Sequence, residues 1–338
     1  MKIPTKNSCE NQIFAFPHEN SRQTAEQPPV AFPLKLHYTG SSSSDQRKAH
    51  AMKEINSTYI SSMLRPRKAD AHKGDFGKVL IFAGSPGMAG AAVLCGRSAL
   101  KSGAGLVQYL LPSLDSPLLP ILQCCVPEAT CLLVNPQLRI QDYQAIACGS
   151  GLSKSREAVR ILSRLFDGCR SVLVTDADAL NLLSESEDLA EHFTASESVR
   201  IITPHIGEAK RLLHSKDPIS SEEERVRAAC TLAEQYRCIC VLKGAGTLVV
   251  RKNGSSFDIY RNTTGNPGMA TGGSGDSLAG LIASLAAQGY SALDAACMGV
   301  WFHGKAGDLA AEELGEMGMI SSDIVHYIPY ALKLSYHN

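Results

Sequence analysis

A glycine-rich segment, residues 262–280, carries the side chain best suited to chemistry, Asp276. The segment runs into an apolar stretch that predicts a helix over 274–288, and it reads Asn-Thr-Thr-Gly-Asn-Pro-Gly-Met-Ala-Thr-Gly-Gly-Ser-Gly-Asp-Ser-Leu-Ala-Gly. The first amides of a helix have no partners within it, and together with the helix dipole they favour a bound anion such as phosphate. Glycines let the backbone approach such a ligand closely. Asp276 would lie beside that phosphate.

Two interpretations of Asp276 compete. A carboxylate at the start of a helix can simply cap it. A carboxylate beside a transferring phosphoryl group can instead accept or donate a proton, while backbone amides hold the developing negative charge. The segment is long and specific, which favours the second interpretation.

A second candidate element is the turn Lys243-Gly244-Ala245-Gly246-Thr247, which separates two apolar runs. One interpretation is a β-hairpin with a solvated lysine. The other is a backbone cradle for a nucleotide phosphate, in which Lys243 adds a point charge.

Histidines and aspartates follow other predicted strands. His205 comes after a Thr-Pro pair at a strand end, where α/β sheets place their ligands, so it could contact a ligand or help to cap the next helix. Asp176 and Asp178 also end a strand. They could orient magnesium-bound water, but Asp178 could equally cap a helix, and we assign neither a catalytic role.

Three further side chains have less informative surroundings. His303 lies within an apolar helical pattern, which predicts a packed core histidine. His72 and Lys73 lie near the start of the predicted domain. They could either pack within a loop or contact the nucleotide, and the sequence does not favour one role over the other.

Short apolar runs alternate with helical patterns along the chain. The predicted strands are 78–83, 105–111, 145–148, 171–174, 200–203, 238–243 and 247–251. The predicted helices are 88–102, 154–166, 206–213, 221–236, 274–288, 291–313 and 321–333. Strands alternating with helices predict a parallel or mixed sheet with helices on both faces. No internal repeat and no second domain boundary is visible in this pattern.

The composition excludes several classes of protein. The formal net charge is +0 and the pI is about 7.1, which does not favour a nucleic acid or an anionic membrane as partner. No apolar run reaches the roughly 18 residues that a transmembrane helix needs. The 11 cysteines are odd in number, lack CxxC spacing and lie mostly in apolar stretches. We therefore expect free thiols packed as small hydrophobes in a soluble, cytoplasmic protein.

Residues 1–55 differ from the rest. They are polar, hold a run of four serines at 41–44, and show no sustained periodicity. Such a segment cannot bury enough apolar surface to offset its ordering entropy, so we expect a disordered extension followed by one domain over 56–338. A targeting peptide is a weaker alternative, because acidic residues are interspersed.

Together, the motifs resemble the ADP-dependent NAD(P)H-hydrate dehydratase family of the ribokinase-like superfamily. They occur in family order over about residues 60–335. The matching pieces are His72–Gly77, Ala83–Ser85, Gly87–Ala92, Ser102–Val107, Asp176–Asn181, Thr203–Glu208, Lys243–Thr247 and 262–280. The resemblance implies a three-layer α/β/α fold with a mostly parallel central sheet. It also implies dehydration of the S-epimer of hydrated NADH or NADPH, by phosphorylation of the ring hydroxyl and elimination of phosphate, with ADP giving AMP.

Site roles follow from the same resemblance. Asp276 would activate the ring hydroxyl, and Gly275 with the turn from Lys243 to Thr247 (Lys243, Gly244, Ala245, Gly246 and Thr247) would hold the adenine nucleotide. Ala91, Gly151 and His205 would line the hydrated cofactor site together with Asp276. Magnesium is expected as the metal cofactor, with no protein ligand assigned, since phosphoryl transfer needs charge neutralisation. A homotetramer and a separate epimerase as functional partner are also implied.

One loop departs from the family pattern. Where the family usually has Gly-Pro-Gly-Leu-Gly after the third strand, this chain has Gly149-Ser150-Gly151-Leu152-Ser153. The runner-up function is a kinase of the same superfamily acting on a hydroxymethyl group of a vitamin precursor or sugar. A third is a non-catalytic nucleotide binder, whose mark would be loss of Asp276 or of the glycine loop, and neither is lost. The choice between ADP and ATP is not readable from the sequence.

Overall fold

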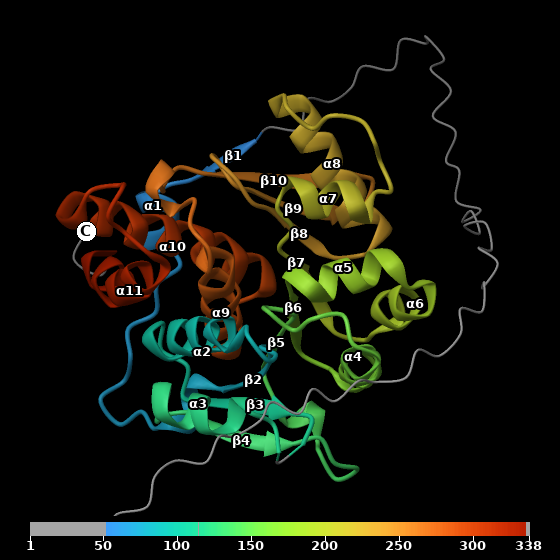
Figure 1. The fold of residues 1–338 in the computed structure, drawn as a ribbon. Coiled ribbons are helices and arrows are strands. Elements are labelled where there is room, and N and C mark those ends of the chain that lie inside the picture. Colours follow the sequence, from blue (N-terminus) through green and yellow to red (C-terminus); the bar gives the residue numbers. More distant parts are fainter. Residues whose placement is uncertain (1–51, 114, 336–338) are drawn as a thin grey trace, which may run out of the picture. The chain divides into compact units, whose positions relative to one another are not determined.

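The computed structural model describes residues 52–113 and 115–335, which contain one ten-stranded sheet (Figure 1). Its order is β1-β10-β9-β8-β7-β6-β5-β2-β3-β4. The strands are β1 Lys53–Ile55, β2 Lys78–Phe82, β3 Leu106–Leu111, β4 Thr130–Leu133, β5 Ala145–Cys148, β6 Val172–Thr175, β7 Val199–Ile202, β8 Ile239–Leu242, β9 Leu248–Asn253 and β10 Ser256–Asn262. Only β9 runs antiparallel to its neighbours. The sheet is therefore mostly parallel, as the sequence predicted.

Helices cover both faces of the sheet. One face carries α1 Ser57–Ser61, α2 Ala89–Lys101, α3 Leu118–Cys125, α9 Ser274–Ala287, α10 Ala292–Leu314 and α11 Ser321–Ser335. The other carries α4 Arg156–Gly168, α5 Ala177–Glu185, α6 Glu187–Ala195, α7 Ile206–Leu212 and α8 Glu222–Gln235. Short 3-10 turns occur at Lys73–Phe76, Ile140–Asp142 and Pro267–Met269. The predicted three-layer α/β/α architecture is confirmed.

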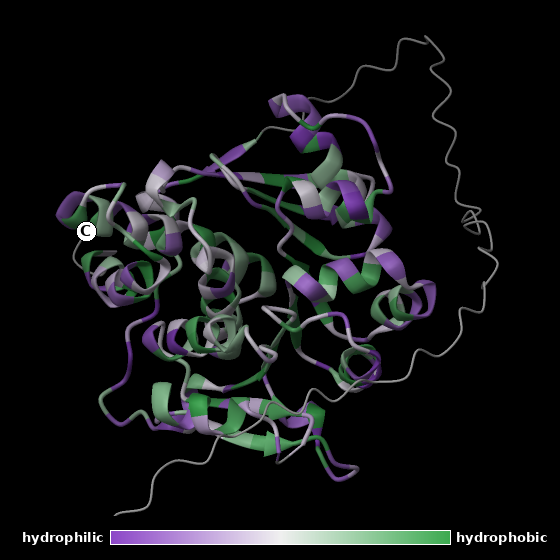
Figure 2. Ribbon diagram, viewed as in Figure 1, coloured by the Kyte–Doolittle hydropathy of each residue, from purple (hydrophilic) through white to green (hydrophobic). Residues whose placement is uncertain are grey.

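The strands are apolar on both sides because both sides are covered. In β2, Val79 and Ile81 pack into the cluster under α2 and α9, while Leu80 and Phe82 pack into the cluster under α4 and α5. Successive strand residues point to opposite faces, so a strand buried between two helical layers needs a continuous apolar run. Figure 2 shows the corresponding pattern, with hydrophobic strands in the middle and polar stretches on the outer helices.

Every predicted strand and helix is present, and several elements were missed. The sequence analysis did not identify β1, α1, α3, β4, α6 and β10. The predicted domain boundary at residue 56 is wrong, because Lys53–Ile55 pairs with β10 in parallel and Ile55 is fully buried. Three residues are too few to show a period-2 pattern, which is why the strand was placed in the extension. Residues 1–51 of that predicted extension lie outside the described residues.

The parallel strands end together at one edge of the sheet. In β2, β5, β6, β7 and β8, neighbouring registers bring these carboxyl ends side by side. The segments after β2, β5, β7 and β8 hold Ala91, Gly151, His205 and Lys243, whereas Gly275 and Asp276 begin α9, after β10. Ligands of α/β sheets bind at this edge.

Two further expectations concern the described residues alone. Their ten cysteines are free thiols, most of them buried or half-buried, which agrees with the predicted role as small hydrophobes. Across the described helices, none combines the length and apolar character needed to cross a bilayer.

Candidate active site

The first turn of α9 is open to a ligand. Its cap residue is Gly273, which has φ 91 and offers no capping side chain. The preceding loop is held in place by Ser321, whose hydroxyl donates to the carbonyl of Gly272 at 2.7 Å. An uncapped helix start points its amide groups outward, and with the helix dipole these favour a bound anion. The anion site predicted from the glycine segment is therefore present as a backbone geometry.

A lysine from another strand lies against this turn. A side chain at Gly275 would start 3.1 Å from Lys243 Nζ and 3.5 Å from Asp176 Oδ2. Only glycine leaves room for the ammonium at that position without displacing it. The structure thus brings together Gly275 and Lys243, which the sequence analysis had placed in two separate nucleotide elements.

Asp276 lies in the same turn with an unusual pKa. Burial and the nearby carboxylate of Asp176 raise its pKa to about 6, while a hydrogen bond from the Ser150 side chain and the charge of Lys243 oppose that rise. Because Gly273 is the cap residue of α9, capping does not explain the aspartate. A carboxylate with this pKa is mostly ionised near pH 7 and still binds a proton more readily than an ordinary aspartate, as a general base requires.

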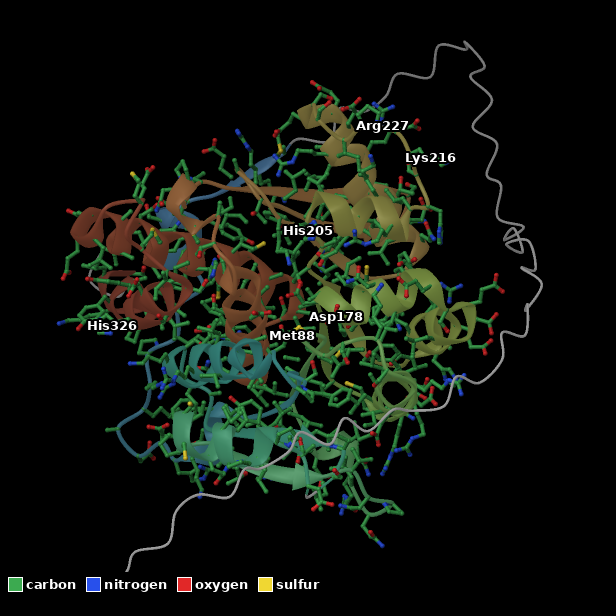
Figure 3. All side chains as sticks on the ribbon, viewed as in Figure 1. Met88, Asp178, His205, Lys216, Arg227 and His326 are labelled. Atoms are coloured by element: carbon green, nitrogen blue, oxygen red, sulfur yellow. The ribbon has the colours of Figure 1, made fainter. Side chains whose placement is uncertain are left out.

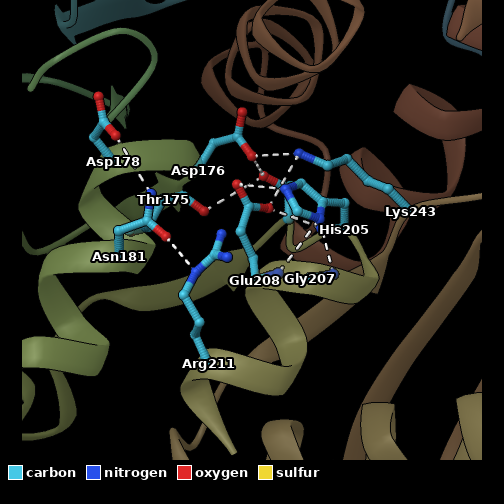
Figure 4. A network of polar contacts seen from close by, with 10 residues as sticks. Thr175, Asp176, Asp178, Asn181, His205, Gly207, Glu208, Arg211 and Lys243 are labelled. Atoms are coloured by element: carbon cyan, nitrogen blue, oxygen red, sulfur yellow. Dashed lines mark hydrogen bonds and ion pairs between the residues drawn. The ribbon is translucent and has the colours of Figure 1, made fainter. Parts of the chain in front are cut away.

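Lys243 is held in a buried ion pair (Figure 4). Its Nζ donates to Asp176 Oδ1 at 2.6 Å, and Glu208 Oε2 lies 3.8 Å away. Asp176 is 1% exposed and also accepts a hydrogen bond from Thr203 Oγ1 at 2.7 Å. Burial opposes the charged ammonium, but the two carboxylates raise the pKa of Lys243 above its usual value. The strands β8 and β9 do form the hairpin considered earlier, but the lysine is mostly buried and paired with Asp176.

The turn after Lys243 is fixed from outside. Arg225 in α8 donates to the carbonyls of Ala245 at 2.7 Å and Gly246 at 3.2 Å. Within the turn, the Thr247 hydroxyl donates to the carbonyl of Gly244 at 2.9 Å. These bonds use three carbonyls of the turn and hold its backbone in place. Nothing in the sequence pattern indicated that Arg225 would brace it.

His205 caps α7. Its Nδ1 accepts hydrogen bonds from the amides of Gly207 at 2.9 Å and Glu208 at 3.3 Å, and Glu208 Oε2 accepts from the His205 amide at 2.8 Å. The capping interpretation is therefore confirmed. An accepting Nδ1 leaves Nε2 as the protonated nitrogen of the neutral ring. The side chain is 54% exposed, so a ligand can still reach it.

Two small residues, Ala91 and Gly151, pack together where the loops after β2 and β5 meet. A side chain at Gly151 would start 2.7 Å from the Cβ of Ala91 and 3.1 Å from that of Met88. The Ser85 hydroxyl donates to the Gly151 carbonyl at 2.9 Å, which joins the loops after β2 and β5. In Figure 3, Met88 and His205 lie in the central region between the two helical layers, unlike the peripheral Lys216, Arg227 and His326.

Asp178 anchors a loop and caps no helix. Its Oδ2 accepts from the amide of Ser153 at 2.8 Å, and its own amide donates to the carbonyl of Gly149 at 3.2 Å. The cap residue of α5 is Asp176, whose side chain makes no capping bond. The capping hypothesis for Asp178 is therefore wrong.

The remaining candidates lie outside the ligand-facing surface. His303 is buried and bonds to the Ser277 hydroxyl at 2.9 Å, and burial lowers its pKa to about 4, so it is a neutral core histidine as predicted. His72 and Lys73 lie at the opposite end of α9, where Gly77 packs against Ala287. That end is about 20 Å from the open turn, which leaves loop packing as their role.

Three side chains of this site were not assigned from the sequence: Asp176, Glu208 and Arg225. Asp176 follows a predicted strand end, which was a usable signal, whereas Glu208 lies in the predicted helix 206–213. Among the described residues, no group of three or more His, Cys, Asp or Glu side chains is arranged to hold a metal ion.

Sequence comparisons agree on one family. The family model for NAD(P)H-hydrate dehydratase matches residues 79–330. A bifunctional NAD(P)H-hydrate repair enzyme of Moorella thermoacetica is 36% identical over 290 residues, which is 82% of this chain and 53% of that protein. An ADP-dependent (S)-NAD(P)H-hydrate dehydratase of Neisseria meningitidis is 35% identical, over 78% of this chain and 87% of that protein. The chain spans about half the length of the bifunctional relatives.

Solved structures give the same result. An ADP/ATP-dependent NAD(P)H-hydrate dehydratase from Bacillus subtilis, co-crystallised with ATP and Mg²⁺, matches with a TM-score of 0.73 and 26% identity, over 85% of this chain and 100% of that chain. A ribokinase-like superfamily protein from Enterococcus faecalis matches with a TM-score of 0.71 and 25% identity, over 85% of this chain and 97% of that chain. The ribokinase-like fold is thereby confirmed.

Proposed function

The chain belongs to the NAD(P)H-hydrate dehydratase family, and on that premise we propose that it returns hydrated NADH and NADPH to the reduced cofactors. The proposed substrate is the S-epimer, and the proposed phosphoryl donor is ADP, which would leave as AMP. The observation that carries the proposal is the carboxylate of Asp276, with a pKa of about 6, in the uncapped first turn of α9.

The proposed reaction has two stages. Asp276 accepts the proton of the ring hydroxyl as its oxygen attacks the terminal phosphorus of the nucleotide. The phosphate then leaves with the carbon–oxygen bond electrons while the ring nitrogen lone pair forms a C=N bond. Loss of a proton from the neighbouring carbon restores the dihydropyridine ring. A hydroxyl is a poor leaving group near pH 7, and its phosphate ester is a much better one.

The surrounding residues would supply position and charge. The amides around Gly275 and the rigid turn from Lys243 to Thr247 would receive the nucleotide phosphates. Ala91 and Gly151 would line the hydrated cofactor site, where the absence of a side chain at Gly151 lets the loops after β2 and β5 pack closely. The half-exposed ring of His205, whose Nε2 lies 3.4 Å from Glu208 Oε1, would contact the hydrated cofactor.

Magnesium fits this site as a companion of the nucleotide. The described residues form no cage of ligands, and magnesium commonly binds through substrate phosphates with few protein ligands. It would neutralise charge between the phosphates. The homotetramer and the separate epimerase that supplies the S-epimer remain part of the proposal.

Substitution of Asp276 tests the proposal. Asp276→Asn keeps the shape of the side chain and removes the base, so we expect turnover to fall far more than tenfold while nucleotide affinity stays within about threefold. The assay follows the absorbance of the reduced nicotinamide after hydrate and ADP are added, with ATP in a parallel reaction. A nucleotide titration by calorimetry checks binding.

Three results would count against it. A variant that keeps more than about a tenth of the wild-type rate, a loss under about 1.4 kcal/mol, would remove Asp276 from its role. No recovery of reduced nicotinamide by the wild-type protein would exclude the dehydratase and favour a superfamily kinase. A loss of nucleotide affinity equal to the loss of rate would indicate a binding defect and not a missing base.

A further inference from the structure

Glu208 in α7 faces both candidate ligand sites (Figure 4). Its Oε1 lies 3.4 Å from His205 Nε2, and its Oε2 lies 3.8 Å from Lys243 Nζ. The family resemblance assigns His205 to the hydrated cofactor and Lys243 to the nucleotide. One carboxylate, whose side chain is only 6% exposed, therefore connects a residue of each site.

Helix capping explains only part of this arrangement. Glu208 Oε2 accepts a hydrogen bond from the His205 amide at 2.8 Å, which is the bond that a capping box needs. The second oxygen, Oε1, takes no part in that bond and lies beside the imidazole ring. The carboxylate is thus placed to act on the ring as well as on the helix.

The imidazole of His205 presents a donor to this carboxylate. Its Nδ1 accepts from the amides of Gly207 at 2.9 Å and Glu208 at 3.3 Å, so the neutral ring carries its proton on Nε2. Nε2 is the atom that faces Glu208 Oε1. Their separation of 3.4 Å exceeds the roughly 2.7–3.2 Å of a usual N–H···O bond, so the contact has room to tighten.

Lys243 is held more closely by its other partner. Its Nζ donates to Asp176 Oδ1 at 2.6 Å but lies 3.8 Å from Glu208 Oε2, a charge contact without a hydrogen bond. The same ammonium reaches the first turn of α9, where a Cβ at Gly275 would lie 3.1 Å away. A phosphate bound at that turn would add negative charge beside Lys243 and weaken its pull on Glu208. The buried carboxylate would then depend more on the Nε2–H of His205.

We propose that Glu208 is a positioning residue that couples the two sites: a nucleotide phosphate beside Lys243 draws Glu208 onto the His205 ring, fixes that ring, and so tightens binding of the hydrated cofactor. Fixing the ring before the second ligand arrives removes part of the ordering cost of that ligand. Because such coupling is reciprocal, the hydrated cofactor tightens nucleotide binding by the same factor. The inference rests on the proposed function, which supplies the two ligands.

Calorimetry measures the coupling with ligands that do not react. The methylene analogue of ADP cannot transfer its terminal phosphate, so the Kd of NADPH hydrate can be measured with the protein free and saturated with the analogue. In the wild type the analogue should lower that Kd about fivefold or more, within the usual range for coupled sites. In Glu208→Gln this factor should fall to about one, while the analogue alone binds at least as tightly as to wild type, because Lys243 has lost one opposing charge.

A matched control separates coupling from capping. Glutamine at position 208 keeps an oxygen for the bond from the His205 amide, so α7 stays capped. Glu224 makes the same capping-box bond in α8, where its Oε2 accepts from the amide of Ser221 at 2.9 Å. Glu224→Gln should therefore keep the wild-type coupling factor. Glu208→Asp, which withdraws the charge by one methylene from both partners, is the second variant should Glu208→Gln fail to fold, and its factor should fall as well.

The ring nitrogens of His205 give a reading that does not depend on turnover. In ¹⁵N-histidine-labelled protein their resonances are identified as those missing from His205→Asn, since asparagine is also a good helix cap. The ADP analogue should shift the Nε2 resonance of wild type, because the bond to Glu208 Oε1 strengthens. In Glu208→Gln the analogue should leave this resonance in place.

Failure of this proposal and failure of the proposed function would look different. A hydrate Kd that the analogue does not change in wild type, or a coupling factor retained in folded Glu208→Gln or Glu208→Asp, would overturn the link through Glu208 even in an active dehydratase. Equal losses of coupling in Glu208→Gln and Glu224→Gln would reduce Glu208 to a capping residue and overturn it too. Normal coupling in a protein that recovers no reduced nicotinamide would overturn the proposed function alone.

Discussion

The two ends of helix α9 are built in opposite ways. At the first turn, Gly273 offers no capping side chain, and the partly buried Asp276 lies among charged neighbours. At the last turn, Gln288 Nε2 donates to the carbonyls of Ser284 at 3.1 Å and Ser102 at 3.0 Å. The amide of Gly289 closes the same turn onto Ala286 at 3.0 Å. The chain itself completes the last turn and leaves the first one to a ligand.

The difference separates residues that stabilise the fold from residues that serve a ligand. Closing a helix end uses its polar groups within the protein and adds stability. An open end keeps donors available for an anion and concentrates charge, which lowers stability at the site. Substitutions at the last turn should therefore lower stability and leave nucleotide binding intact, whereas removal of the buried charge at the first turn should abolish turnover and raise stability.

The largest effect is expected at the closed end, from Gly77→Ala. Gly77 has φ 70, and a Cβ there would lie 2.0 Å from the backbone oxygen of Ala287. The clash and the left-handed backbone together should lower the free energy of unfolding by about 3 to 4 kcal/mol. Urea denaturation measures the loss, and calorimetry should find an unchanged nucleotide Kd in the folded variant.

Gly289→Ala is the matched control for that substitution. Gly289 has φ 86 at the same helix end, but a Cβ there would meet no atom within 4 Å. The free energy of unfolding of Gly289→Ala should fall by only about 1 kcal/mol, the cost of placing alanine at a positive φ. Equal losses of stability in the two variants would contradict the proposed difference between the two ends of α9. A loss of nucleotide affinity greater than about threefold in Gly77→Ala would contradict it as well.

At the first turn of α9, the substitution Asp276→Asn should raise the free energy of unfolding. An unfolded aspartate has a pKa of about 3.9, whereas the folded pKa of Asp276 is about 6, so the folded state binds the proton more tightly. As pH rises through this window, the unfolded chain ionises first and the wild-type protein loses stability. The variant cannot ionise, so above pH 6 it should be more stable than wild type by about 1 to 3 kcal/mol.

Denaturation from pH 4 to pH 8 checks this expectation. The difference in the free energy of unfolding between Asp276→Asn and wild type should be absent near pH 4, grow between pH 4 and pH 6, and stay constant above pH 6. A variant that is less stable than wild type at pH 8 would show that the carboxylate contributes to folding. The open end would then resemble the closed one.

The sequence predicted the fold well wherever an element was long or continuously apolar. Strand β2 is a continuous apolar run and helix α4 keeps a helical period throughout, and both were found within a few residues of their bounds. Elements that depend on distant partners were not predictable. β1 has three residues and is a strand only because β10 lies beside it, and sequence-local patterns do not show that pairing.

The sequence identified individual residues of the site but not the contacts between them. Motifs indicated Asp276, Lys243 and His205, and the structure places Lys243 near both of the others. The ion pair of Lys243 with Asp176 joins residues 67 positions apart, and the approach of Lys243 to Gly275 joins the turn after β8 to the first turn of α9. Such pairs are set by the packing of separate elements, which no spacing along the chain encodes.

The smallest effect is expected beside the open end, from Ser153→Gly. Ser153 has φ 64, a left-handed conformation that suits glycine, and glycine is the residue the family usually has there. Glycine should relieve the strain, partly offset by its greater freedom in the unfolded chain, for a net gain of about 0.5 to 1 kcal/mol. Because the loop is held through the amide of this residue, which bonds to Asp178, the substitution keeps that contact.

Ser155→Gly is the control of opposite sign two residues along the loop. Ser155 has φ −82 and caps α4 by accepting from the amide of Ala158 at 3.1 Å, so glycine should cost a few tenths of a kcal/mol. Thermal unfolding of the two variants should therefore shift Tm in opposite directions. If Ser153→Gly were neutral or destabilising, the serine would be making a contact that offsets its strain, and the loop beside the open end would be stabilised by its departure from the family pattern.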